Sequence, residues 1–251
     1  MKHVNRIMGI QAAPYHTHSN QRFPLGQVME LPDGRIYRYA ENGAVALAAA
    51  KLCQTMALGA NFDTLAIQAA RAVGTTTIPF TTSGSTVAEN QFADGTVVVE
   101  DVALNLGEIY PVKSNTSAAD PATCTLTLHD GVTVLNALTT TGKVTVRVNP
   151  WKQVIVVPTV APSQMVVGVP QVIVGISAYG WLQTHGVCNV VVDATVTAWV
   201  IGQGVRPSED DAGGAAFLDF DEAAQADKGL IGFAIIAGTD LDFAPIFLRI
   251  E

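Results

Sequence analysis

The strongest constraint on the fold of this chain is a step in its composition near residue 72. Val, Ile and Thr together occur ten times up to Arg71 and sixty times from Ala72 to the end of the chain, so their share of the sequence more than doubles. These side chains branch at Cβ, lose rotamer freedom in helices and pack well on the pleated surface of a sheet. We therefore expect the chain after residue 72 to consist mostly of strands.

Turn residues divide this β-rich part into short runs. From Thr75–Thr81 to Ala244–Ile250 the runs are separated by Gly, Asp, Pro and Asn, and no helical segment lies between them. Such spacing is typical of all-β sandwiches and barrels, whereas a parallel α/β sheet needs helices between its strands. The expected fold class is mainly β: a compact β-barrel or β-sandwich over residues 73–251, with two β subdomains split near residue 160 as an alternative.

Residues 1–43 have a different pattern, with little periodicity and frequent turn residues. Asp33-Gly34 stands between two strand-like runs, Val28–Leu31 and Arg35–Tyr39. A dipeptide of this kind between such runs is a hairpin signal. We expect an extended N-terminal arm that carries a short hairpin and has little core of its own.

Residues 44–72 are expected to form a helical segment. The stretch 44–58 is rich in Ala, which has the highest intrinsic helix propensity, and Gly59 follows it as a helix terminator. A second short helix is expected over residues 64–73. The fold class therefore includes an extended N-terminal arm and one Ala-rich helix beside the β domain.

Charge excludes several classes of partner. Only 14% of the 251 residues are charged and 49% are hydrophobic; the net charge is −8, with +3 on the chain up to Arg71 and −11 on the rest. An acidic chain whose basic residues form no run lacks the footprint of a nucleic-acid-binding protein. No apolar run approaches the roughly 18 residues of a membrane-spanning helix, and no secretory signal follows the N-terminus. We expect no nucleic acid, no membrane, and residence in the cytoplasm or in a particle assembled there.

The sequence carries no short motif of a hydrolytic nucleophile, a phosphate-binding loop or a zinc cluster. The three cysteines, Cys53, Cys124 and Cys188, are far apart and are expected to be small core residues. The acidic stretch Ser208–Gly214 lacks the ligand spacing of a Ca²⁺ loop and is expected to be solvated. We therefore expect no catalytic residues, no metal, no cofactor, and a protein that is not an enzyme.

Two chemical alternatives remain. His16 and His18 lie two residues apart and offer two imidazoles to a metal ion. The second is a β-barrel hydrolase or isomerase in which His185 is the general base and Asp193 or Asp130 orients it. Neither is accompanied by further motif residues, so both rank below a binding protein.

The basic and aromatic residues of the arm are the candidate binding site. Arg and Tyr anchor protein interfaces more often than most residues, and here they are interleaved within a basic segment that suits an acidic protein surface. The candidate contact residues are Arg22, Phe23, Arg35, Tyr37, Arg38 and Tyr39.

Several segments, taken in order, carry a resemblance to a known family. They are the hairpin Leu31–Ala40 followed by the Ala-rich stretch, the motif Tyr179–Gly186 (YGWLQTHG), Gly202–Val205, Gly229–Ala234 and the final Ala244–Ile250. This order resembles the small head decoration (capsid cement) proteins of tailed bacteriophages, in which such strands build a compact β-barrel. The resemblance covers about residues 20–58 and 165–251.

The resemblance implies a structural virion protein that binds the outer surface of an icosahedral phage capsid and stabilises it. The implied partners are the major capsid protein and other copies of the chain, commonly as a homotrimer, with the protein made in the host cytoplasm. Trp181 and Trp199 are expected to be intersubunit or core aromatics. The alternative is a head or tail fibre component that binds a host glycan, with Trp151, Trp181 and Trp199 as candidate platforms.

Overall fold

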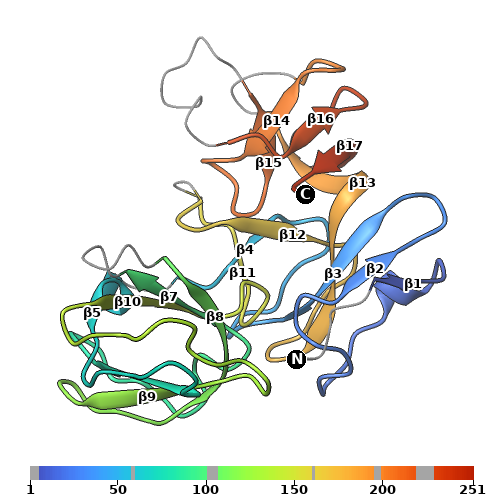
Figure 1. The fold of residues 1–251 in the computed structure, drawn as a ribbon. Helices are drawn as coiled ribbons and strands as arrows, with labels where there is room; N and C mark the ends of the chain where they lie inside the picture. The colour runs from blue at the N-terminus through green and yellow to red at the C-terminus, as the bar shows by residue number, and fades with distance from the viewer. Residues whose placement is uncertain (1–5, 58–59, 101–106, 160–161, 195–198, 219–228) are drawn as a thin grey trace. The chain divides into compact units, whose positions relative to one another are not determined.

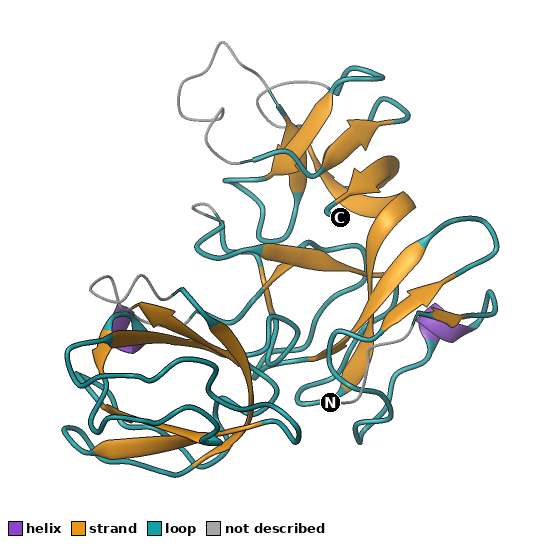
Figure 2. Ribbon diagram, in the orientation of Figure 1, coloured by secondary structure: helices purple, strands orange, loops and turns teal. Residues whose placement is uncertain are grey.

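The structure, a computed structural model, describes residues 6–57, 60–100, 107–159, 162–194, 199–218 and 229–251. Strands and loops make up nearly all of it (Figure 2), which confirms the mainly β fold class. The chain forms two compact units: an inserted unit, residues 58–149, and a host unit, residues 2–57 together with 150–251. The boundaries expected at residues 43, 72 and near 160 do not coincide with these units.

The inserted unit is a six-stranded antiparallel sheet in the order β5-β10-β7-β8-β9-β6. A bridge between Ile67 and Phe80 joins the β5 end of this order to β6, so the sheet closes in the manner of a barrel. A short 3₁₀ turn, η2 (Ala60–Phe62), precedes it. The strands are β5 (Leu65–Ala66), β6 (Thr77–Thr81), β7 (Thr96–Glu100), β8 (Ile109–Asn115), β9 (Thr123–Leu128) and β10 (Lys143–Arg147).

The host unit is organised around one long strand, β13 (Tyr179–Asp193) (Figure 1). A second ring of strands closes here, because β13 pairs with both ends of the order β15-β14-β16-β17. Also in this unit are β1 (Ile7–Met8), the 3₁₀ turn η1 (Ala13–Tyr15), β2 (Val28–Glu30), β3 (Ile36–Glu41), β4 (Cys53–Gln54), β11 (Ile155–Val156), β12 (Val166–Pro170), β14 (Gly204–Pro207), β15 (Ala215–Phe217), β16 (Gly232–Ala234) and β17 (Phe243–Arg249).

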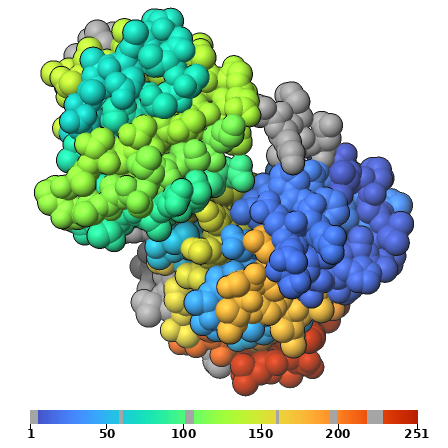
Figure 3. Space-filling model, turned by 90° about the horizontal axis from the view of Figure 1, so that it is seen from below, coloured from blue at the N-terminus to red at the C-terminus, as the bar shows by residue number. Residues whose placement is uncertain are grey.

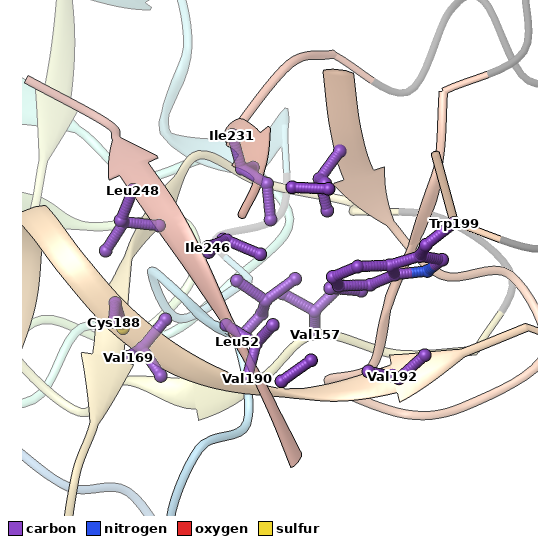
Figure 4. Packing of buried hydrophobic residues seen from close by; sticks show 14 residues of the cluster. Leu52, Val157, Val169, Cys188, Val190, Val192, Trp199, Ile231, Ile246 and Leu248 are labelled. Carbon is purple, nitrogen blue, oxygen red and sulfur yellow. The ribbon is translucent and has the colours of Figure 1, made fainter. Parts of the chain in front are cut away.

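The interior of this five-stranded barrel is filled by apolar side chains that alternate along its strands. On β17, Ala244, Ile246 and Leu248 are buried, whereas Phe243 and Phe247 are exposed. Successive side chains of a strand point to opposite faces, so one set fills the barrel and the other covers it. Figure 4 shows the buried set, in which Ile246, Leu248 and Ile231 meet Val190, Val192, Trp199, Leu52, Val157, Val169 and Cys188.

The N-terminal segment is part of this unit's sheet, and the expected extended arm is wrong. The hairpin itself is confirmed: β2 and β3 pair antiparallel, and Gly34 adopts the positive φ of +84° that the turn requires. However, β3 also pairs with β13 at six positions, and in the space-filling view the blue N-terminal residues lie against the orange ones (Figure 3). The segment has a core of its own, because its aromatic side chains alternate inward and pack with Trp181.

The expected Ala-rich helix is also wrong. Residues 44–57 contain no helix, and Ala50 has a φ of +61°, outside the helical region. The backbone is instead hydrogen-bonded to distant segments: Leu47 and Val174 exchange two bonds, of 3.0 and 3.1 Å, and the Leu52 amide donates to the Gly213 carbonyl at 2.8 Å. Intrinsic propensities differ by less than about 1 kcal/mol per residue, so tertiary pairing overrides them.

The second expected helix, residues 64–73, is replaced by β5 and a bridge from Arg71 to Leu138. That bridge belongs to a structural repeat that the sequence did not reveal. In both units, two turn segments are joined by a single pair of residues, and in each pair the amide of either residue donates to the carbonyl of the other. The pairs are Leu47 with Val174, Arg71 with Leu138, and Val87 with Ala118.

The closure of the inserted unit predicts that it folds by itself. All strand pairings of β5 to β10 stay within residues 58–149, so the isolated fragment keeps its hydrogen-bond network and its buried Phe80 and Phe92. We expect a fragment of residues 58–149 to show a β-type circular dichroism spectrum and a cooperative thermal transition. A fragment that melts without cooperativity would contradict this.

Candidate interaction surface

The six candidate contact residues lie close together, but as packing rather than as an exposed anchor. Tyr37 and Tyr39 have 0% of their surface exposed. Phe23 is half-buried, with its ring centroid 5.2 Å from that of Tyr39 and 5.3 Å from that of Trp181. Burial raises the pKa of the Tyr37 phenol, as expected for a hydroxyl removed from water. The two tyrosines are core residues, and their role as surface anchors is corrected accordingly.

The two hairpin arginines are held by internal partners. Arg35 donates to Asp33 at 2.8 Å, to the Tyr37 hydroxyl at 3.1 Å and to Gln11 at 2.5 Å. Its guanidinium therefore connects the hairpin tip to the segment of the same chain that contains Gln11. Arg22 differs, because its side chain is exposed while its amide donates to the Tyr39 hydroxyl.

Arg38 binds the last residue of the chain. Its guanidinium donates to both carboxylate oxygens of Glu251, the shortest contact being 2.5 Å, and lies 4.9 Å from the ring centroid of Trp151. Thr184 on β13 donates to the same carboxylate at 2.7 Å. The hydrogen bond from Arg38 is the main reason that the pKa of Glu251 is lowered. The Arg38–Glu251 pair thus joins β3, β13 and residue 251.

The tryptophans are not exposed platforms. Trp181 is 2% and Trp199 3% exposed, so of the two expected roles they have the core role. The indole of Trp199 donates to the Asp193 carbonyl at 3.1 Å inside the barrel. Trp151 is half-buried and covered by Arg38. The glycan alternative loses the aromatic surface on which it depended.

The residues of the enzyme alternative do not form a catalytic group. His185 and Asp193 lie on the same strand eight residues apart, which corresponds to roughly 26 Å. The Nδ1 atom of His185 lies 3.1 Å from the carbonyl oxygen of Glu251, and Asp193 accepts from Ser208 at 2.6 Å. Asp130 accepts from Lys113 at 2.7 Å. Each group is therefore satisfied by a structural partner.

The two histidines of the possible metal site, His16 and His18, have different surroundings. The Nδ1 atom of His18 lies 3.2 Å from the Tyr39 hydroxyl, and its ring packs against Phe23 and Tyr39. Burial is the largest cause of the lowered pKa of His18, followed by the nearby charge of Arg22. His16 is exposed.

An acidic cluster stands at one end of the barrel. Carboxylate oxygens of Asp193, Asp211 and Asp240 lie within 4.8 Å of one another. Desolvation and the charges of the other two aspartates raise the pKa of Asp211, against a smaller opposing effect of Lys51. Oxygen ligands of this type suit Ca²⁺ or Mg²⁺, but three carboxylates are fewer than the six to eight oxygens that Ca²⁺ takes. The stretch 208–214 is therefore not simply solvated, as Ser208 is fully buried.

An exposed apolar surface on the barrel was not identified from the sequence. It lies on the outer side of β13, β17 and β16, and we call it the barrel face: Val187, Phe233, Ile235, Phe243, Pro245 and Phe247. Phe247 on β17 lies between two partners, Val187 on β13 and Phe233 on β16. These three residues therefore form a continuous row across the three strands. Phe243, the most exposed of the six, is 56% exposed. Contiguous apolar surface of this kind marks interaction sites on proteins.

The barrel face has a basic residue at one end. Arg249, the last residue of β17, is exposed and lies on the same side as Phe243, Pro245 and Phe247. Beside Arg249 stands His185, its partner on β13, whose ring packs edge-on against Phe247 at 5.3 Å. An open depression of about 510 Å³ adjoins this basic end and is lined by Gln11, Asp33, Gly34, Arg35, His185, Gly186, Val187 and Phe247.

The sequence matches no family model, and no curated protein and no solved structure was found to match it. The resemblance to phage decoration proteins therefore rests on the sequence motifs alone. Among the helices of the described part of the chain, none has the length and apolar character to cross a membrane.

The Arg38–Glu251 pair predicts a pH-dependent effect on stability. Because the pKa of Glu251 is lowered in the folded state, the pair stabilises at pH values above the ordinary carboxyl pKa of 4.5, and this is lost as pH falls through the lowered value. Glu251→Gln should lower the unfolding free energy of the host unit at pH 7 by about 1 kcal/mol or less, and not at pH near 2. Calorimetry at both pH values checks this. Glu30→Gln, whose partner Arg6 is 57% exposed, should have a smaller effect.

Asp211 predicts an effect of the opposite sign. A carboxyl whose pKa is raised on folding destabilises the folded state once pH exceeds that pKa, and the penalty persists at neutral pH. Asp211→Asn should therefore raise the melting temperature at pH 7, and the gain should vanish near pH 3, where the carboxyls are protonated. The exposed Glu89→Gln serves as a control. A lower melting temperature for Asp211→Asn at pH 7 would show that the carboxylate is stabilising.

Proposed function

We propose that this protein is a structural component of a phage virion that binds the outer surface of the capsid and stabilises it, in association with other copies of itself. The function is not enzymatic in this proposal. The protein is made in the host cytoplasm and resides on the assembled particle, with the major capsid protein as its partner.

The observation that carries the proposal is the amount of apolar side chain left exposed by a chain with so few charges. Both units contribute to it: Val45, Ile173 and Ile176 in the host unit, and Ile109 and Leu135 in the inserted unit, are each more than 60% exposed. Contiguous apolar surface such as the barrel face marks interaction sites, and a low content of charged residues suits subunit contacts, because charge is depleted in the core of protein interfaces. The sequence motifs that resemble decoration proteins agree with this class of function.

The capsid-binding surface is proposed to include Arg22 and the half-buried Phe23, which remain accessible on the N-terminal segment. Tyr37 and Arg38 are unsuitable for a test, because their replacement removes core packing and the Arg38–Glu251 pair. Arg22 is the better probe, since its exposed side chain can be replaced without opening the core. Charged residues at an interface rim mainly affect the association rate and its salt dependence.

The proposal predicts a high copy number on the particle. Quantitative mass spectrometry of purified virions should give a ratio to the major capsid protein near one to one, because a cement protein tiles the shell. A handful of copies would favour a fibre component. If no copies were found, the protein would not be a component of the virion.

A binding experiment complements the count. Purified protein should sediment with undecorated shells, and Arg22→Glu should reduce this binding several-fold at low salt and less at high salt, since salt screens exposed charges. Lys143→Glu, at an exposed position on the inserted unit, is the matched control. Equal binding by both variants and the unmodified protein would place the capsid contact elsewhere.

A further inference from the structure

His18 attaches residues 16–22, the segment between η1 and β2, to the sheet of the host unit. Its amide donates to the Tyr179 carbonyl at 2.9 Å, and its carbonyl accepts from the Tyr179 amide at 2.8 Å. The His18 ring packs against Tyr39 and Phe23, with centroid distances of 5.9 and 6.5 Å. The following residues 19–22 are exposed. A segment with so few buried side chains opens at a low cost in free energy, so its attachment depends on His18.

The hydroxyl of Tyr39 determines which form of the imidazole fits here. This hydroxyl accepts a hydrogen bond from the Arg22 amide at 3.2 Å and lies 3.2 Å from the Nδ1 atom of His18. Tyr39 has none of its surface exposed, so the proton of its hydroxyl needs an acceptor within the protein. Nδ1 accepts that proton only when it carries none itself. A neutral imidazole with its proton on Nε2 therefore satisfies both side chains.

Protonation of His18 removes this match. An imidazolium carries a proton on both ring nitrogens, so Nδ1 changes from an acceptor to a donor and the Tyr39 hydroxyl proton loses its acceptor. The pKa of His18 is lowered first by burial and then by the charges of Arg22 and His16. A buried polar group without a partner and the repulsion between like charges both act against the attached segment.

The titratable groups of the two neighbouring strands do not offset this effect. β3 contributes the phenol of Tyr39, and burial raises its pKa. β13 contributes the phenol of Tyr179, whose pKa is raised by burial and then by the charge of Glu41. Both phenols are therefore neutral at every pH at which His18 titrates. Glu41 is the β3 partner of Tyr179, on the side of β13 away from His18.

We propose that His18 is a pH-dependent latch, which holds residues 16–22 on β3 and β13 while its imidazole is neutral and lets this segment open once it is protonated. Opening exposes the sides of Phe23 and Tyr39 that the His18 ring covers. In the opened segment His18 has its ordinary pKa of 6.5, whereas the closed segment lowers it. The closed form is therefore favoured above pH 6.5 and is lost progressively as the pH falls below that value.

The latch goes beyond the proposed function and does not depend on it, because it concerns the free protein without capsid. A failure of shell binding leaves the latch intact, and a failure of the latch leaves the capsid proposal intact.

The first test uses the full chain without any substitution. An NMR titration of the His18 imidazole should give a pKa below 6.5. Hydrogen-exchange protection of the amides of His18, Tyr179 and Arg22, corrected for intrinsic exchange rates, should fall several-fold between pH 7.5 and pH 5. Leu47 and Val174 form a bridge of the same kind and serve as the internal control, with unchanged protection. A His18 pKa of 6.5 or above, or an equal loss of protection at both bridges, would overturn the latch.

The second test assigns the pH dependence to one histidine. His18→Gln keeps a side-chain acceptor for the Tyr39 hydroxyl but cannot be protonated, so the Tyr179 amide should be protected equally at pH 7.5 and pH 5. His16→Gln removes the exposed histidine of the same segment and should keep the several-fold loss. A loss that persists in His18→Gln, or one that disappears in His16→Gln, would also overturn the latch. Circular dichroism shows whether each variant is folded, and the titration of the unmodified chain needs neither of them.

Discussion

The rest of the host unit depends on the double pairing of β13. Its first part forms hydrogen-bonded pairs with β3 and β12, and its second part pairs with β17 and, at its end, with β15. The register with β3 shifts between Gln183 and His185, next to Gly186, which has a φ of +89°. A bulge of this kind bends a strand and increases its twist. One strand therefore serves two layers: the N-terminal hairpin on one side of the bulge and the barrel on the other.

The bulge also determines which side chains become available on the surface. A Cβ at Gly186 would lie 3.1 Å from Cγ and 3.3 Å from Cα of Arg35, which is a tight contact, and the positive φ of this residue favours glycine as well. Beyond the bulge, alternation places Val190 and Val192 in the barrel and Val187 and Asn189 outside it. The apolar row formed by Val187, Phe247 and Phe233 thus begins at the point where β13 leaves the hairpin.

The strand pattern was predictable, because alternation and turn residues are local signals. The Asp33-Gly34 hairpin appears where the sequence placed it, and the runs Thr75–Thr81 and Ala244–Ile250 correspond closely to β6 and β17. The Ala-rich segment was not predictable in the same way, since Leu47 pairs with Val174, more than one hundred residues away. Intrinsic propensity carries no information about such a partner.

The burial of Tyr37 and Tyr39, two of the six candidate contact residues, was missed for a different reason. Aromatic residues interleaved with arginines occur both at interfaces and at the edge of a core, and only the alternation of Tyr37 and Tyr39 with Ile36 and Arg38 separates the two cases. Read with a period of two, that alternation places both tyrosines on one buried side. The barrel face also had a signal: β17 is apolar at both parities up to its last residue, Arg249, which indicates two apolar sides.

The division of the host unit by the inserted one has a consequence for synthesis on the ribosome. The hairpin of β2 and β3 emerges first, yet its neighbour β13 follows only after the whole of residues 58–149 has been made. Joining chain segments across so long a loop costs entropy, although the cost grows slowly with length. If the inserted unit folds as it emerges, its own closure shortens the effective loop before β13 arrives. Until β13 has been made, Met29, Tyr37 and Tyr39 lack Trp181, the residue of β13 that packs against them. During this stage of synthesis their apolar surface is exposed and can cause aggregation.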